Sequence, residues 1–386
     1  MKRLLAGGTV LALAALAAAC AGEPKISIAI HSDSAGIEIV TNRGPDRALD
    51  WRFTPVFALG GEEEGPEAFY SLWPAVVTAD RVGNLYVIDR AHFRLVSFDS
   101  TGAHRWSAGK EGGGPGEFRM PVAVVAAPDG TVEVYDAGNN RVERYASDGA
   151  SLGSEPLGFP AYQSRFSHVD AGLAMDFGRF GPADGHRLAI VSDGDTTELL
   201  TIDPSQPQLV EFPDCPIRVS MAAIFTPGIV WGAAGNRVTA SPGAGYELAV
   251  FEGDRQVASF RRALPVIEAT AAIAAREIPE VGMRIRAGTM ECTMTPAQVV
   301  EARGFAAYAP LVSRLLVAPD GAVWVERRVP DGDPVIDVIG SDGEYLGTLS
   351  PDARFPIGFT AAGHVLLLDT DELDVMRLGV YRVERN

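Results

Sequence analysis

PAVVTADRVGNLYVIDRAHFRLVSFDSTG, residues 74–102, recurs without gaps 47 positions later as PVAVVAAPDGTVEVYDAGNNRVERYASDG, residues 121–149. Each copy alternates short runs of Val, Leu, Tyr and Phe with turns that contain Gly, which predicts four short antiparallel strands. A four-stranded unit of about 47 residues that recurs along a chain is typical of one blade of a β-propeller. The matching positions include Pro74/Pro121, Val77/Val124, Gly83/Gly130, Val87/Val134, Asp89/Asp136, Arg94/Arg141, Ser100/Ser147 and Gly102/Gly149.

Weaker copies of the same pattern bring the number of predicted blades to six. The turn and its flanking strands recur over Val317–Glu326 and again over Gly363–Asp369. Two degenerate copies are placed over Ser164–Phe212 and Ser220–Arg262. Because this total fits the length of the chain, the sequence predicts an all-β fold, a six-bladed β-propeller with a small α-helical insertion.

A ring of blades must be closed, and the stretch Trp51–Gly60 is placed to close it. Trp51–Gly60 leads into the Gly-rich loop before the first repeat, just as Arg105–Ser107, the last strand of that repeat, leads into the Gly-rich loop before the second. By this analogy we expect Trp51–Gly60 to be the outer strand of the sixth blade. Ser34–Val40 is expected to add a further edge strand. Residues 20–50 are therefore assigned to a tether with an N-terminal edge strand, and residues 51–386 to the propeller.

The stretch 264–311 departs from the strand pattern. Glu268–Ile278 is rich in Ala and stops before Pro279, which predicts a helix. A second helix is predicted to begin after Thr295, with Pro296 at its first position and Gly304 beyond its end. The sequence thus predicts a pair of helices inserted into the ring.

The first twenty residues have the organisation of an export signal. Lys2 and Arg3 form a short positive region, an apolar run continues from Leu4 to Ala19, and Cys20 follows. The run is shorter than the ~20 residues that a spanning helix needs. Residues 1–19 are therefore predicted to be removed on export. Ordinary signal cleavage, with Cys20 incidental, is the alternative to lipid attachment at that residue.

Net charge and the remaining cysteines limit the classes of function. The net charge is −17 and no cluster of Lys and Arg stands out, so nucleic-acid binding is not expected. Like charges repel one another, so we expect a soluble monomer. Cys215 and Cys292 enter an oxidising compartment if the chain is exported, and a disulfide between them is the simplest pairing. Spacing alone does not establish that they are close, so free thiols stay open.

Several of these motifs together resemble a known family. The GGGPGEF loop at 112–118, the turn that ends in Asp-Gly and the Asp-x₄-Arg spacing resemble NHL-repeat propellers. The whole layout is similar to the six-bladed propeller lipoproteins of bacteria. Ala17–Cys20 resembles a lipobox, although Ala17 stands where that motif usually has Leu. This resemblance implies cleavage before Cys20, a lipid on its thiol, an acylated amine and a place in the cell envelope, periplasmic or at the outer membrane.

Few residues stand out as chemical groups. Asp89 with Arg94 and Asp136 with Arg141 recur at one blade position, which favours a structural role in which each Arg pairs with its Asp. The six His residues are scattered and no nucleophile motif is present, so we expect no metal, no cofactor and no catalytic residue. Residues just before each inner strand face the mouth of a propeller, and aromatic and Arg side chains there favour binding. The predicted rim consists of Tyr70, Trp73, Arg119, Gln163, Arg165 and Tyr308.

These observations favour a membrane-anchored, extracytoplasmic binding or scaffold module for a protein, peptide or glycan. One alternative is a metal-dependent propeller enzyme of the lactonase or lyase type. Another is a structural component of an envelope complex. An enzyme of that kind predicts buried carboxylates or imidazoles around a metal in the channel, whereas a binding module predicts a polar or aromatic rim without such a cluster.

Lipid attachment is tested by replacing the sulfur that would carry the lipid. We expect Cys20→Ser to move the protein from the membrane fraction to the soluble fraction, because no other apolar stretch is long enough to hold it. The measurement is fractionation of cells that express each form. Retention of the Cys20→Ser protein in the membrane fraction would contradict the prediction.

Overall fold

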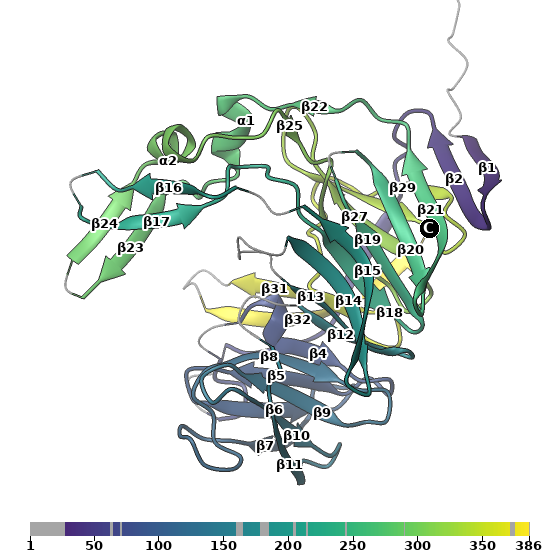
Figure 1. Cartoon of the computed structure of the whole chain (residues 1–386). Helices are drawn as coiled ribbons and strands as arrows, with labels where there is room; N and C mark the ends of the chain where they lie inside the picture. The colour runs from purple at the N-terminus through teal and green to yellow at the C-terminus, as the bar shows by residue number, and fades with distance from the viewer. Residues whose placement is uncertain are drawn as a thin grey trace, which may run out of the picture.

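The structure, a computed structural model, describes residues 28–61, 65–69, 72–159, 165–177, 185–203, 206–213, 215–243, 245–288, 290–370 and 375–385. Antiparallel strands dominate these residues, and six sheets surround one axis (Figure 1). The fold is the predicted six-bladed β-propeller. Cys20, Tyr70, Gln163 and residues 1–19 lie outside the described residues.

The two gap-free repeats form blades one and two. Blade one consists of β4 (Val77–Ala79), β5 (Leu85–Asp89), β6 (Arg94–Phe98) and β7 (His104–Ala108), and the 3₁₀ turn Pro74–Val76 precedes it. Blade two consists of β8 (Pro121–Ala126), β9 (Val132–Asp136), β10 (Arg141–Tyr145) and β11 (Ser151–Pro156). Gly83 and Gly130 occupy the left-handed backbone region, with φ values of 92° and 89°, as the predicted hairpin turns require.

The degenerate copies form blades three and four, with bounds that differ from the prediction. Blade three consists of β12 (Phe166–Val169), β13 (Gly172–Phe177), β14 (His186–Ser192) and β15 (Asp195–Ile202). Blade four consists of β18 (Val230–Ala234), β19 (Arg237–Ser241), β20 (Glu247–Glu252) and β21 (Arg255–Arg262). Residues 206–212 and 220–229, which the prediction assigned to these two blades, lie outside both sheets.

Blade six is completed by the N-terminal strand, as predicted. Blade five consists of β26 (Val312–Val317), β27 (Val323–Arg327), β28 (Val335–Ile339) and β29 (Tyr345–Thr348). Blade six consists of β30 (Gly358–Phe359), β31 (Val365–Thr370), β32 (Met376–Arg385) and β3 (Trp51–Leu59). β3 pairs antiparallel with β32 from Trp51↔Arg385 to Leu59↔Leu378, so the two ends of the propeller chain close the ring.

Residues 37–49 form a strap that crosses two more blades before β3 begins. β1 (Ile28–Ser34) and β2 (Ile37–Arg43) form a hairpin, and β2 lies parallel to β21, so the expected edge strand extends blade four. The strap then crosses blade five, where Thr348 N–H donates to Arg47 O at 2.7 Å and Leu49 N–H donates to Thr348 O at 2.8 Å. One continuous segment therefore ties blades four, five and six together.

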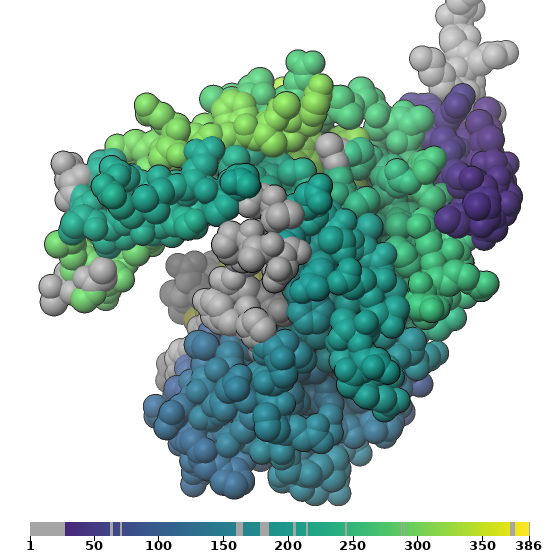
Figure 2. All heavy atoms as spheres, in the orientation of Figure 1, coloured from purple at the N-terminus to yellow at the C-terminus, as the bar shows by residue number. Residues whose placement is uncertain are grey.

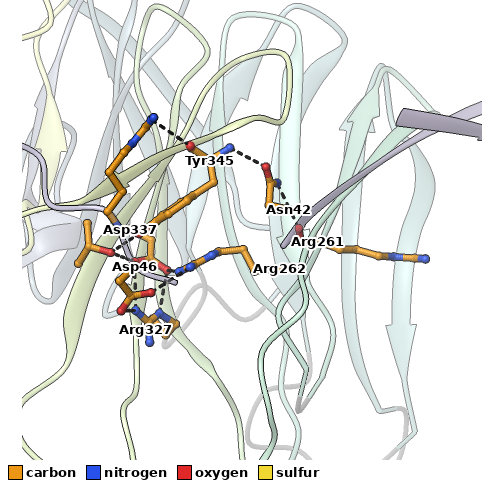
Figure 3. A network of polar contacts seen from close by, with 9 residues as sticks. Asn42, Asp46, Arg261, Arg262, Arg327, Asp337 and Tyr345 are labelled. Atoms are coloured by element: carbon orange, nitrogen blue, oxygen red, sulfur yellow. Dashed lines mark hydrogen bonds and ion pairs between the residues drawn. The ribbon is translucent and has the colours of Figure 1, made fainter. Parts of the chain in front are cut away.

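Four charged side chains fasten the strap to the ring (Figure 3). Arg262 and Arg327 each contact the buried carboxylate of Asp337, at 2.7 Å and 2.8 Å. The same two guanidinium groups reach Asp46 on the strap, at 2.9 Å and 2.6 Å. Two positive and two negative groups thus alternate around a closed quartet, and the Arg262 guanidinium also lies 3.7 Å from the centre of the Tyr345 ring.

Two insertions, rather than one, build a projection that we call the arm (Figure 1). The first, residues 206–225, contains β16 (Gln208–Glu211) and β17 (Arg218–Met221). The second, residues 264–311, contains β22 (Ile267–Glu268), α1 (Ala271–Arg276), β23 (Met283–Ala287), β24 (Met290–Met294), α2 (Pro296–Arg303) and β25 (Tyr308–Ala309). The prediction of a purely helical insertion is wrong in part, because strands separate the two short helices.

The two insertions are joined covalently and through their backbones. A disulfide links Cys215, beside the β16–β17 hairpin, to Cys292 in β24, with 6.1 Å between the Cα atoms. Ile224 N–H donates to Gly304 O at 3.0 Å, and Ala306 N–H donates to Ile224 O at 2.8 Å. The predicted cap of the second helix is confirmed, since Thr295 and Gln298 form a reciprocal capping box.

Asp46→Asn tests the strap quartet. Burial opposes ionisation of Asp46, but hydrogen bonds and charge from Arg262 and Arg327 outweigh it and lower the pKa of Asp46 below its ordinary value. The substitution leaves both guanidinium groups to share Asp337, so we expect a loss of about 1–2 kcal/mol in urea unfolding. A carboxyl whose pKa is lowered on folding stabilises above its ordinary pKa, so the gap should close as the pH falls below about 4.

Asp50→Asn is the matched control, because Asp50 lies nearby but meets only the exposed Arg52, at 3.5 Å. It should cost less than about 0.5 kcal/mol. Equal losses for the two variants would contradict the role of the quartet.

The double variant Cys215→Ala, Cys292→Ala tests whether the arm depends on its disulfide. The bond closes a long loop, with a sequence separation of 77, for which chain entropy gives up to about 4 kcal/mol. We expect limited proteolysis to cut the variant first within 206–221 and 283–294, while the blades stay resistant. Unchanged protection of the arm would show that its noncovalent contacts suffice.

Candidate functional site

The direction of the strands places all long connections on one end of the ring. In each blade the chain runs from the inner strand to the outer strand, and successive strands alternate in direction. The connection from the outer strand of one blade to the inner strand of the next therefore lies at the same end of the ring as the connection between the second and third strands. We call this end the connector face. The Gly-rich loops, the arm and the residues just before each inner strand belong to it, which makes it the candidate binding face.

Buried Asp side chains at the ends of second strands organise this face in the first three blades. Asp136 accepts hydrogen bonds from the backbone N–H groups of Arg119 and Met120, at 3.0 Å and 2.8 Å. Asp176 accepts the backbone N–H of Arg165 at 2.7 Å. Asp89 lies in the equivalent place in blade one. In blades two and three, the carboxylate therefore fixes the backbone that carries an Arg into the mouth.

The paired Arg residues act mainly on the Gly-rich loops. Arg94 bonds Asp89 at 2.9 Å, as expected, and also donates to Gly65 O at 2.9 Å. Arg141 does not pair with Asp136. Its guanidinium meets Glu143 at 2.5 Å and donates to the carbonyl groups of Gly113, Gly114 and Glu117. The expected ion pair between Arg141 and Asp136 is thus wrong, because the Arg141 guanidinium is taken up by Glu143 and by the carbonyl groups of the Gly-rich loop.

His186 is a structural partner that the sequence reasoning missed. Its Nε2 lies 3.0 Å from Asp176, and its Nδ1 accepts the backbone N–H of Ile229 at 2.9 Å. An Nδ1 that accepts leaves the proton on Nε2, so the ring is neutral and donates to Asp176. Burial opposes ionisation of Asp176, but His186 and the Arg165 N–H keep its pKa below the ordinary value. The pair joins blade three to the start of blade four.

Three of the predicted rim residues lie at the mouth, and one does not. Trp73 is half-buried under the guanidinium of Arg90, 4.8 Å from its ring centre. Arg119 is exposed. Arg165 donates to Trp231 O at 2.8 Å and lies 5.5 Å from the Trp231 ring. Tyr308 belongs to the arm, where β25 pairs with β22, and is 45% exposed.

Two Arg residues on the connector face differ from most other Arg residues on the surface of the molecule. Most surface Arg residues meet a carboxylate, as Arg81 meets Asp170 at 2.8 Å and Arg237 meets Glu252 at 2.9 Å. Within the described residues, Arg90 and Arg119 form no ion pair. The mouth of an otherwise acidic protein therefore carries cations whose charge is free to meet a ligand.

Two grooves on the opposite face were not predicted. They flank the turn from Thr360 to His364 in blade six and have volumes of about 490 Å³ each. Ala361, Ala362 and His364 line both, the first against blade five and the second against blade one. Their walls come from hairpin turns that vary between blades, so the repeat pattern gives no signal for them.

Potential metal ligands do not converge in the part of the chain that is described. Among those residues, no group of three or more His, Cys, Asp or Glu side chains is arranged to hold an ion. None of the described helices has the length and apolar character to cross a bilayer.

Comparison with known proteins gives similarity of fold. No family model and no curated protein matches the chain. A structure described as an exported protein of Bacteroides fragilis is 11% identical, with a TM-score of 0.51, and the match covers 90% of this chain and all of that one. Virginiamycin B lyase of Staphylococcus aureus is 13% identical over 87% of this chain and 89% of that chain, with a TM-score of 0.40. Regucalcin of Agrobacterium tumefaciens, a calcium-binding protein, is 12% identical over 88% and 96%, with a TM-score of 0.37. At 11% identity, the likeness to the Bacteroides fragilis structure is one of fold. The ring of six blades is established by the strand pairing.

Proposed function

We propose that the protein is a lipid-anchored, extracytoplasmic binding module whose connector face holds a ligand that carries carboxylate groups. The observation that supports this most is the set of Arg residues at the mouth. The backbone N–H groups of Arg119 and Arg165 each donate a hydrogen bond to a buried Asp carboxylate, which fixes the position of the backbone. The guanidinium of Arg90 lies over the Trp73 ring. A rigidly presented guanidinium is the side chain best matched to a carboxylate, because its planar fork donates two parallel hydrogen bonds.

The support of the Arg90 side chain is aromatic. The Trp73 ring lies against the face of Arg90 and leaves the edge of the guanidinium open for hydrogen bonds. An acidic neighbour would neutralise the charge and compete with the ligand. A flat aromatic support orients the cation and leaves its charge available, which is the arrangement expected of a binding site for an anion.

The arm extends past the ring on the connector face, as Figure 2 shows. Its base is fixed to blade five by Arg328, whose guanidinium pairs with Glu277 on the arm at 2.8 Å. A ligand at the mouth would therefore meet the ring on one side and the arm on another. Such a ligand would be a polymer, either an acidic peptide segment or a glycan that contains uronic acids.

A metal-dependent enzyme of the lactonase or lyase type is the second candidate. The buried Asp176–His186 pair on the connector face is the observation that favours it, because such a pair can serve as a general base. Both ring nitrogens of His186 are occupied by structural partners, so the pair supports the binding function better. Stoichiometric calcium or zinc in the purified protein would favour the enzyme.

Arg119→Glu tests the proposed site. The probes are a poly-glutamate peptide and an oligogalacturonate, each titrated against the mature protein by calorimetry. We expect one of the two to bind, and the substitution to weaken that binding at least about 10-fold, because it replaces a charge-assisted hydrogen bond by repulsion. The probe that binds identifies the source of the carboxylate.

Arg52→Glu is the matched control, since Arg52 is an exposed Arg on the outer strand of blade six, with its side chain 71% exposed. It should leave the affinity unchanged. Failure of both probes to bind the wild-type protein, or equal weakening by the two variants, would contradict the proposal.

A further inference from the structure

Most of the exposed large apolar side chains belong to the arm or to β1. Eleven large apolar residues are exposed in the described part of the chain, and eight of them lie on the arm or on β1. Three lie elsewhere, namely Val56, Val82 and Leu152. The eight are Ile28, Ile30, Leu209, Val266, Val281, Met290, Phe305 and Tyr308. Isolated exposed apolar residues are common, but a concentration of this kind marks a surface that is covered in use.

The N-terminal segment enters the fold beside the base of the arm. Ile28, the first described residue, lies opposite Arg43 in the β1–β2 hairpin. Asn42, which precedes Arg43 in β2, lies opposite Arg262 at the end of β21 in blade four. The arm begins two residues later at 264. Strand register therefore places the start of the described chain next to the root of the arm.

The covalent reach from the predicted anchor is short. Eight residue steps separate Cys20 from Ile28, which span at most about 28 Å even when fully extended. A lipid on Cys20 would hold the root of the arm within that distance of the bilayer. The root of the arm and the predicted anchor are thus close together.

We infer that the arm rests on the lipid bilayer, with its exposed apolar side chains in the interfacial layer. The inference rests on the lipid anchor of the proposed function. Phe305 and Tyr308 are aromatic side chains of the kind that favour this layer. The side chains of Arg284 and Arg286 on β23 are 67% and 75% exposed, and the two cations share one carboxylate, Glu291, at 3.0 Å and 3.8 Å, which leaves one net positive charge to meet lipid phosphates. A lipid anchor gains a second, reversible contact in this way.

This contact would orient the mouth. Blades one and two, which carry Trp73 and Arg119, lie at the opposite end of the molecule from α1 and β22 (Figure 1). With the arm on the bilayer, these blades would lie farther from the lipid than blades four and five. The mouth shares the connector face with the arm, so the ligand site would open into the space between the ring and the membrane-bound arm.

Tryptophan quenching on vesicles tests the contact. The full mature chain is attached through a His tag in place of Cys20 to vesicles of phosphatidylethanolamine, phosphatidylglycerol and a nickel-chelating lipid, with brominated acyl chains as quencher. We expect Val281→Trp, at a position 80% exposed, to lose most of the added Trp emission. Met290→Trp repeats the test from a second site if the first variant misfolds.

Val82→Trp is the matched control, because Val82 is 77% exposed on the hairpin turn of blade one, on the face opposite the arm. Its added emission should be retained. Equal quenching at both positions, or none at either, would overturn the inference, and absence of quenching would point to a protein as the partner of the arm. The tag supplies the tether, and carboxylate binding is measured without vesicles, so failure here is distinguishable from failure of the anchor or of the ligand site.

Discussion

The pairing of β3 with β32 is the contact on which the rest of the structure depends. A blade has two broad faces, and it is stable only when neighbours cover both of them. Blades two to five have a sequence neighbour on each face, whereas blades one and six cover each other only when the ring closes. β3 brings Trp51 and Phe53 against Trp324 of blade five, with ring centres 6.0 Å apart in each pair, so one strand both completes a sheet and fills the gap beside it.

Under the proposed lipid attachment at Cys20, the segment that closes the ring would also link the ring to the membrane. From Ile37 to Leu59 the chain adds a strand to blade four, crosses blade five and completes blade six. Asp46 holds it midway through two buried guanidinium groups. Any pull on a lipid at Cys20 would be carried along this strap into three blades. A tether attached to one surface loop would load that loop alone.

Sequence reasoning succeeded where local pattern and global fold agree. The gap-free repeat, the Gly turns and the equivalent placement of Trp51–Gly60 gave the six blades and their closure. It missed the second half of the arm, because β16 and β17 are four residues each and fall where two degenerate repeats were expected. It missed the quartet, since Asp46, Arg262, Arg327 and Asp337 are spread over the chain and meet only in the folded ring. The repeat pattern could have pointed to His186. Asp176 occupies the blade position of Asp89 and Asp136, and a buried Asp at that position needs a hydrogen-bond partner, which His186 supplies.

The candidate binding face combines a fixed backbone with exposed side chains. Buried Asp residues and loop-clamping Arg residues keep the connector backbones fixed, and the exposed side chains on those connectors are free to differ between proteins of this fold. Closure of the ring is the condition for all of this, and amide hydrogen exchange in β3 tests it most directly. The account predicts that the amides of β3 are as protected as those of β31 and β32 and lose protection in the same cooperative transition in denaturant. Exchange of β3 at the rate of a free N-terminal segment, with the other blades still protected, would contradict it.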